Sequence, residues 1–259
     1  MSTLSTIHPR QALFGSEHQV PSLPVCDHYC GAEAHMRKSL MLQAELAEAG
    51  NGRAVFDVTL DLEDGAPVGG EHEQALLVAE LIDSTHNVCD RVGARVHDPR
   101  HRRFEDDVDA LIKTAGHRLA YIMVPKLADT ADAQRAVDVI KAARVKHGVA
   151  RVVPVHGLIE TLKAVQQVDA IAALPGLESL SFGLMDFVSE HRGAIPATAM
   201  GAAGQFSHPL VMQAKLKIAA ACHAAHITPS HCVVTEFKDK RALSNAAERA
   251  CRELGYTRM

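Results

Sequence analysis

The sequence predicts an α/β fold and, within that class, a (β/α)8 TIM barrel. Short apolar segments of strand character alternate with helical segments in about seven β/α units, with no break in composition between them. Strands that are each followed by a helix favour a parallel sheet. A length of 259 residues suits one barrel, which commonly needs about 250. The sequence contains no Gly-x-Gly-x-x-Gly or Walker-type loop, which makes a nucleotide-binding open sheet the weaker alternative.

The predicted strands are short, apolar and bounded by turn-forming residues. In residues 54–62, apolar Val58, Leu60 and Leu62 alternate with polar side chains, which is the two-residue period of a strand. Residues 120–124 form a continuous apolar run, as expected of a strand covered on both faces. The other predicted strands are residues 25–26, 94–97, 151–155, 180–183 and 231–234.

Helical segments separate these strands. Apolar residues spaced by three and four predict a helix over residues 104–115, which Gly116 closes. Thr130 is predicted to cap the next helix, and Pro209 falls in the first turn of a later one. Residues 1–21 are polar and rich in turn formers, so we expect an N-terminal arm before a single barrel domain of residues 22–259. The remaining predicted helices lie within residues 31–50, 71–83, 162–174, 207–225 and 243–254.

Composition excludes several classes of partner. The net charge is -4 and aromatic residues make up 4% of the chain, with no basic stripe beside them, so we expect no nucleic-acid partner. No apolar run approaches the roughly 20 residues of a membrane helix, and the N-terminus has no continuous apolar segment typical of a signal peptide. The six cysteines lack paired metal-ligand spacing, and we interpret them as reduced thiols of a cytoplasmic protein.

Three carboxylates and a glycine end the strand of residues 54–62. They are Asp61, Glu63, Asp64 and Gly65. Carboxylates that share one face at a strand end raise each other's pKa unless a cation lies between them. We interpret this group as part of a functional site, with a structural ion pair as the alternative.

Other polar residues are predicted at the ends of separate strands. In a barrel, the C-terminal strand ends line the active site. The carboxylates of Glu160 and Asp186 suit Mg²⁺, which binds one or two carboxylates and keeps several waters. The planar fork of Arg95 suits a substrate carboxylate. Lys126 and His156 also fall at predicted strand ends. Structural alternatives are a helix-terminal acid, an internal ion pair and a solvated lysine.

Five short motifs occur in order along the chain: LDLED at residues 60–64, RV at 95–96, VPK at 124–126, LIET at 158–161 and FGLMD at 182–186. In order and approximate spacing they resemble the HpcH/HpaI aldolase and citrate lyase beta-subunit-like family, over roughly residues 51 to 256. The resemblance implies a TIM barrel, a divalent metal (Mg²⁺ or Mn²⁺) and a homo-oligomer, commonly a trimer or hexamer. It also implies formation or cleavage of a carbon–carbon bond, often in 2-hydroxy or 2-keto acids or their CoA thioesters.

The resemblance also implies site residues. Glu160 and Asp186 match the metal ligands, and Arg95 matches the arginine that binds the substrate carboxylate. The acidic motif of residues 61–64 matches the group beside the metal and its waters. The predicted catalytic residues are Arg95, Asp61, Glu63 and Asp64, and the predicted substrate-binding residues are Arg95, Lys126 and His156.

The sequence departs from the family pattern in several places. His97 stands where the family often has Asn, and Leu184-Met185 replaces the more usual Ala-Glu before the metal-binding aspartate. The N-terminal strand lacks the family's Phe-Val-Pro-Gly start, which contributes to CoA contacts, so the need for CoA stays open. The family continues past the position of Met259 into a last strand. We therefore expect the eighth strand to be missing from this chain, unless the barrel closes differently.

The sequence thus predicts a Mg²⁺-dependent carbon–carbon lyase or aldolase acting on a 2-hydroxy or 2-keto acid or a hydroxyacyl-CoA adduct. Mg²⁺ held by Glu160 and Asp186 would stabilise the oxyanion that develops. His156 is a candidate for the base that takes the hydroxyl proton. Two alternatives stay open. Lys126 would form an imine in a Schiff-base aldolase, and a non-catalytic barrel would bind an acyl-CoA or a carboxylate without turnover.

Overall fold

The computed structural model describes residues 23–50, 52–236 and 238–259, so the predicted arm of residues 1–21 lies outside the described residues. Within the described chain, seven strands form one parallel sheet whose spatial order follows the sequence. This neighbour order is that of a TIM barrel. The strands are β1 (Asp27–Cys30), β2 (Asp57–Asp61), β3 (Val92–Arg95), β4 (Ile122–Val124), β5 (Val155–Ile159), β6 (Leu177–Phe182) and β7 (Thr228–Ser230).

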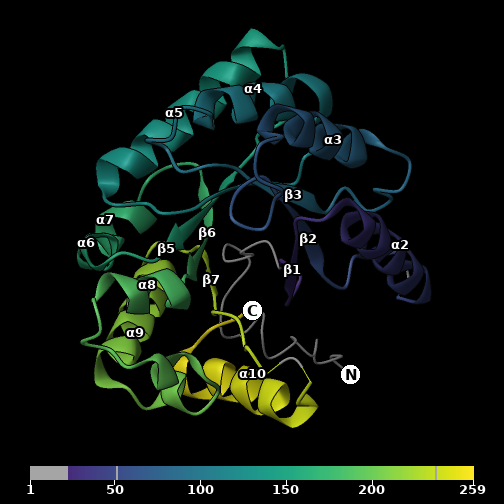
Figure 1. Cartoon of the computed structure of the whole chain (residues 1–259). Coiled ribbons are helices and arrows are strands. Elements are labelled where there is room, and N and C mark those ends of the chain that lie inside the picture. Colours follow the sequence, from purple (N-terminus) through teal and green to yellow (C-terminus); the bar gives the residue numbers. More distant parts are fainter. Residues whose placement is uncertain (1–22, 51, 237) are drawn as a thin grey trace, which may run out of the picture.

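Helices surround the sheet (Figure 1). None in the described part of the chain is long and apolar enough to cross a membrane. Two 3-10 helices, η1 (Ala197–Met200) and η2 (Gly204–Phe206), lie between the helices of residues 184–190 and 209–224. The α-helices are α2 (Glu33–Ala49), α3 (Glu71–Asp83), α4 (Phe104–Ala115), α5 (Thr130–Lys146), α6 (Leu162–Gln166), α7 (Val168–Ala172), α8 (Leu184–Glu190), α9 (Pro209–Ala224) and α10 (Lys240–Leu254).

Strand β2 shows how alternation places polar groups inside the ring of strands. Val58 and Leu60 are fully buried and belong to the main apolar core. The intervening Thr59 points to the other face, where its hydroxyl lies 2.8 Å from Asp27 Oδ1 and 2.7 Å from Tyr121 Oη. Since side chains alternate along a strand, Asp61 lies on this inner face as well.

The last residues of the chain join the two edges of the sheet. Arg258 forms a parallel bridge with Ser230 at the end of β7. On the other side, the backbone N–H of Asp27 in β1 donates to Met259 O over 2.8 Å, and that of Met259 donates to Val25 O over 2.9 Å. The segment 256–259 therefore lies where an eighth strand would lie. The prediction of a missing last strand is not confirmed.

Arg258 holds this closure from inside the ring. Its side chain is 1% exposed, and it pairs with Asp57 through Nη1 and with Asp27 through Nη2. Its guanidinium also lies 5.7 Å from the centre of the Tyr121 ring. Asp57 is shared with Arg91, which binds it through two hydrogen bonds of 2.7 and 2.6 Å. Buried charges persist when they are paired in this way.

Several predicted boundaries were wrong. Strand β5 pairs from Val155 onward, because Pro154 has no N–H to donate to the ladder, so His156 lies inside the strand. Strand β7 ends at Ser230, and the predicted strand 231–234 instead leaves the sheet. One predicted helix is two, α6 and α7. The cap of α5 is Asp129, whose Oδ1 accepts from the backbone N–H of Asp132 over 3.0 Å.

Candidate active site

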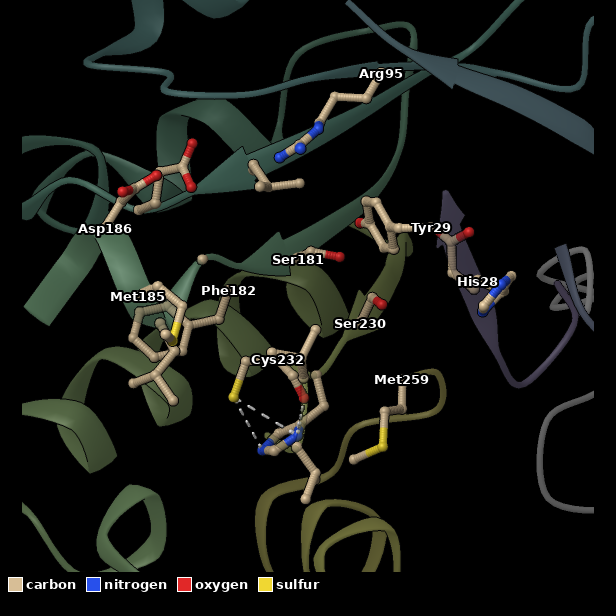
Figure 2. A pocket seen from close by; sticks show the side chains of 18 of the residues that line it. His28, Tyr29, Arg95, Ser181, Phe182, Met185, Asp186, Ser230, Cys232 and Met259 are labelled. Atoms are coloured by element: carbon tan, nitrogen blue, oxygen red, sulfur yellow. Dashed lines mark hydrogen bonds between the residues drawn. The ribbon is translucent and has the colours of Figure 1, made fainter. Parts of the chain in front are cut away.

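A cavity of about 570 Å³ opens at the C-terminal ends of the strands (Figure 2). Four of the predicted site residues line it: Asp64, Arg95, Glu160 and Asp186. They come from the ends of β2, β3, β5 and β6. Parallel strands that are adjacent in the sheet bring these side chains together although they are far apart in sequence.

Asp61 fixes the orientation of Arg95. The guanidinium donates two hydrogen bonds to this carboxylate, from Nε to Oδ1 over 2.7 Å and from Nη2 to Oδ2 over 2.5 Å. Nη1 lies 3.3 Å from Glu63 Oε2. Burial lowers the pKa of Arg95, but the hydrogen bonds and charges of Asp61 and Glu63 outweigh burial and raise it. The guanidinium is therefore a permanent cation that two carboxylates hold in place at the cavity wall.

The acidic loop folds around the same carboxylate. The backbone N–H groups of Glu63 and Gly65 donate to the two oxygens of Asp61 over 3.0 and 2.8 Å. A Cβ at Gly65 would clash with Asp61 Oδ2. The glycine in this motif is thus required by the close approach of the side chain to the loop, and Asp61 acts as the organiser of residues 63–65.

Lys126 pairs with the other two acids of the loop. Its Nζ contacts Glu63 Oε1 and lies 3.0 Å from Asp64 Oδ2. Burial lowers the pKa of Lys126, but these two carboxylates outweigh burial and raise it. An amine forms an imine only in its neutral form. Lys126 also does not line the cavity. Both observations weigh against Lys126 as a Schiff-base residue or a direct substrate contact.

Glu160 and Asp186 form an acidic pair without a protein cation. Glu160 is 4% exposed. Burial raises its pKa to about 8; the hydrogen bond that its Oε1 accepts from the Lys126 N–H opposes this rise, and the charges of Asp186 and Glu63 add to it. No lysine, arginine or histidine among the described residues forms an ion pair with either carboxylate. The pair therefore fits a divalent cation.

Few side chains at the Glu160–Asp186 pair could bind a metal ion directly. Among residues 23–50, 52–236 and 238–259 there is no group of three or more Asp, Glu, His or Cys side chains arranged to hold a metal ion. Mg²⁺ usually takes one or two carboxylates and fills its remaining positions with water and substrate. Gly183 makes room for one of the two carboxylates, because a Cβ there would clash with the Glu160 side chain.

His156 lies deeper in the barrel than predicted. It is 2% exposed, and its Nε2 lies 2.6 Å from Ser181 Oγ. Burial, together with the charge of Arg258, holds the pKa of His156 well below its usual range. Leu158, two residues later on the same face of β5, lines the cavity, whereas His156 does not. The structure does not bring His156 to the cavity as a substrate contact or base, and the cause is the later start of β5.

The sequence analysis missed the part of the cavity wall that lies beyond β7. Residues 230–234 line it, together with Leu243 of α10 and Met259. Tyr29 of β1 was also missed; its ring centre lies 5.9 Å from the Arg95 guanidinium. The apolar run at residues 232–234 was the available signal, but its strand-like pattern assigned it to the sheet. The contribution of Met259 depends on barrel closure, which local patterns do not report.

The chain is similar to a known protein family and to several solved structures. A model of the HpcH/HpaI aldolase/citrate lyase family matches residues 43–258. A citrate lyase from Burkholderia xenovorans LB400 is 52% identical and has a TM-score of 0.87, with 92% of this chain and 72% of that chain covered. Protein CitE from Mycobacterium tuberculosis was solved with magnesium, acetoacetate and coenzyme A. It has a TM-score of 0.69 at 19% identity, covering 92% of this chain and 76% of that chain, which is a likeness of fold.

A curated relative matches part of the chain. It is the L-malyl-CoA/beta-methylmalyl-CoA lyase of Cereibacter sphaeroides, which is 29% identical over 133 residues. The match covers 51% of this chain and 42% of the relative, so less than half of that enzyme's length is represented here.

Proposed function

Because the chain belongs to the HpcH/HpaI aldolase/citrate lyase family, we propose that it is a Mg²⁺-dependent carbon–carbon lyase of the citrate lyase beta-subunit type. Its substrate would be a 2-hydroxy or 2-keto acid, or a hydroxyacyl-CoA adduct. The observation that carries this proposal is the pair Glu160 and Asp186, which shares one cavity with Arg95 and forms no ion pair within the described part of the chain. The lyase activity in the relative's name and the magnesium bound by CitE support the same chemistry.

The metal would be held by Glu160 and Asp186, with Mn²⁺ suited to the same oxygen ligands. When bound, it would supply Lewis acidity toward the carboxylate and the adjacent oxygen of the substrate. Glu160 must give up its proton for this role. Its raised pKa in the metal-free protein therefore couples metal binding to proton release.

Arg95 would bind the substrate carboxylate and keep it beside the metal. Asp61 binds the edge of the guanidinium formed by Nε and Nη2, and Nη1 lies 3.3 Å from Glu63 Oε2, so the orientation of Arg95 is set before substrate arrives. Lys126 neutralises part of the charge of the acidic loop and keeps Asp64 ionised: burial raises the pKa of Asp64, but the hydrogen bond and charge of Lys126 outweigh burial and lower it. Asp64 would then hold a water of the metal.

Assembly and location remain predictions. The family resemblance predicts a homo-oligomer, a trimer or hexamer. The cysteine content predicts a cytoplasmic protein, and the length and unbroken β/α pattern predict a single barrel domain. Light scattering of the purified chain would give the assembly size directly.

The test is a retro-aldol assay on a panel of hydroxyacyl-CoAs and hydroxy-keto acids, with and without EDTA. We expect cleavage with Mg²⁺ and its loss with EDTA. Asp186→Ala should lose activity by about 100-fold or more, because it removes a direct ligand. Asp169→Ala is the matched control, since Asp169 is exposed on α7 outside the cavity.

Three results would contradict the proposal. Full activity of Asp186→Ala would refute the metal assignment. Activity that survives EDTA, together with borohydride trapping of pyruvate on Lys126, would support a Schiff-base aldolase instead. Binding of panel members without turnover of any of them would support a non-catalytic barrel.

A further inference from the structure

The cavity has two chemically different ends. One end holds Arg95 and the acids described above. The other is formed by residues 230–234, Leu243 and Met259, and we refer to these residues as the neutral end. Figure 2 shows Cys232 and Met259 together at one side of the cavity, with Arg95 and Asp186 at the other. Both ends belong to one continuous space, so a single ligand would reach from one to the other.

Large apolar side chains are exposed on the wall of this space. Val233 is 52% exposed and Leu243 is 47% exposed, and Met185 of α8, between the two ends, is 44% exposed. Apolar surface left open in a concave site favours a ligand group that removes it from water.

The neutral end contains no lysine or arginine among its lining residues. Its histidine, His231, is neutral: burial and the charge of Lys215 lower the pKa of His231 to about 3. The His231 ring stacks on Phe206 with 5.3 Å between ring centres. Asp27, which lines the same cavity, is paired with Arg258. A carboxylate placed at this end would meet no lysine or arginine among the described residues that form it.

Nearby cations point elsewhere. Lys215 is fully buried behind the wall, where its Nζ donates to Gln205 Oε1 over 2.9 Å and lies 4.2 Å from the centre of the Phe206 ring. Lys240 and Arg241 begin α10 but do not line the cavity. His28 lines the rim and is exposed to solvent, where salt screens its interactions.

We infer that the neutral end binds an uncharged, largely apolar chain of the substrate, and that this enzyme selects against substrates with a second carboxylate at that position. The inference rests on the proposed function, because the binding of the substrate carboxylate at Arg95 sets the direction in which the rest of the substrate extends. The same chemistry is offered by an alkyl chain on the acid itself and by the uncharged arm of a thioester. Val233 and Leu243 are the specificity-determining residues.

The experiment compares two ligands that differ in one group. With Mg²⁺ present, binding of 2-ketoheptanoate and of 2-ketoheptanedioate to the whole chain is measured by calorimetry, with pyruvate as the reference. We expect the monoacid to bind about tenfold or more tightly than the diacid, because burying an unpaired carboxylate is unfavourable. A pantetheine thioester of malate tests the thioester arm. Tighter binding of that thioester than of the ketoheptanoate would identify a thioester as the source of the chain.

A substitution in the neutral end should remove the preference. Val233→Lys places a cation at the neutral end on an exposed side chain, so it should raise the affinity for the diacid relative to the monoacid by about tenfold. Val145→Lys on α5 is the control, because Val145 is 77% exposed and lies outside the cavity. It should leave the ratio of the two affinities unchanged.

The outcomes separate this inference from the function on which it rests. If pyruvate binds with Mg²⁺ but the diacid binds as tightly as the monoacid and as the thioester, the inference is wrong and the proposed function stands. If no keto acid or thioester binds in the presence of Mg²⁺, the proposed function fails and the inference fails with it.

Discussion

Glu160→Gln tests the chemistry of the acidic pair through stability alone. Glu160 is 4% exposed, and burial is the main reason that its pKa rises from 4.5 to about 8. Glutamine keeps the size of the side chain and an oxygen that can accept the Lys126 N–H. The substitution removes only the ability of this side chain to ionise. The variant therefore isolates the free-energy cost of ionising this carboxyl in the folded, metal-free protein.

The sign follows from proton binding. Below pH 4.5 the carboxyl is protonated in both states, so ionisation costs no stability. Between pH 4.5 and about 8 the folded state holds a proton that the unfolded state has released, so stability falls as the pH rises, and the loss is complete above about pH 8. One pKa unit corresponds to about 1.4 kcal/mol, so between about pH 5.5 and 7.5 the wild type should lose about 2 to 3 kcal/mol through this group.

The assay is urea unfolding in EDTA across that pH window. The stability of Glu160→Gln relative to wild type should rise by about 2 to 3 kcal/mol from about pH 5.5 to 7.5. Glu80→Gln, an exposed glutamate of α3, should run parallel to wild type. Excess Mg²⁺ should stabilise wild type more at the higher pH and affect Glu160→Gln little, because the metal binds the ionised carboxylate. Parallel curves for wild type and Glu160→Gln would refute the buried, protonated carboxyl.

Two further substitutions probe the packing that supports the site. Gly183→Ala should destabilise the protein by about 1 to 3 kcal/mol and weaken Mg²⁺ binding, since the added Cβ clashes with Glu160. Gly70→Ala, where a Cβ meets no atom, is its control, and equal metal affinity in the two variants would contradict the packing role. Arg258→Met should cost about 3 to 5 kcal/mol in urea unfolding, because Asp27 and Asp57 lose a buried partner. Arg252→Met, which removes an exposed pair with Glu248, should cost less than about 1 kcal/mol, and similar losses in both arginine variants would show that the interior pairing contributes little.

The sequence located the carboxylates of the candidate site because their positions depend on short-range patterns. The alternation of residues 54–62 placed Asp61 opposite the apolar face of its strand, and the predicted strands 151–155 and 180–183 placed Glu160 and Asp186 a few residues after strand ends. Sequential parallel strands then bring successive strand ends to one rim. The order of strands and helices was enough to predict that these side chains meet at one rim. The hydrogen-bond register between neighbouring strands was not needed.

Local sequence patterns did not predict how deep a side chain lies in the barrel or the register in which neighbouring strands pair. The proline at position 154 shifted the start of β5, and this shift moved His156 from the rim to the interior. The run at residues 232–234 reads as a strand by composition, but it forms a cavity wall because β7 pairs with β6 only through Ser230. Which residue of an apolar run begins a strand is decided by its neighbour in the sheet.

The sequence by itself therefore determined the class of fold, the order of its elements and the acids and arginine at four strand ends. Only the tertiary structure decided how the ring closes, which inner residues reach the cavity, and that the cavity has a neutral end. The physical reason is distance along the chain. Periodicity and caps reflect neighbours within a few residues, whereas the Arg258–Asp57 pair joins residues 201 apart, and Met259 enters the cavity wall only because that closure forms.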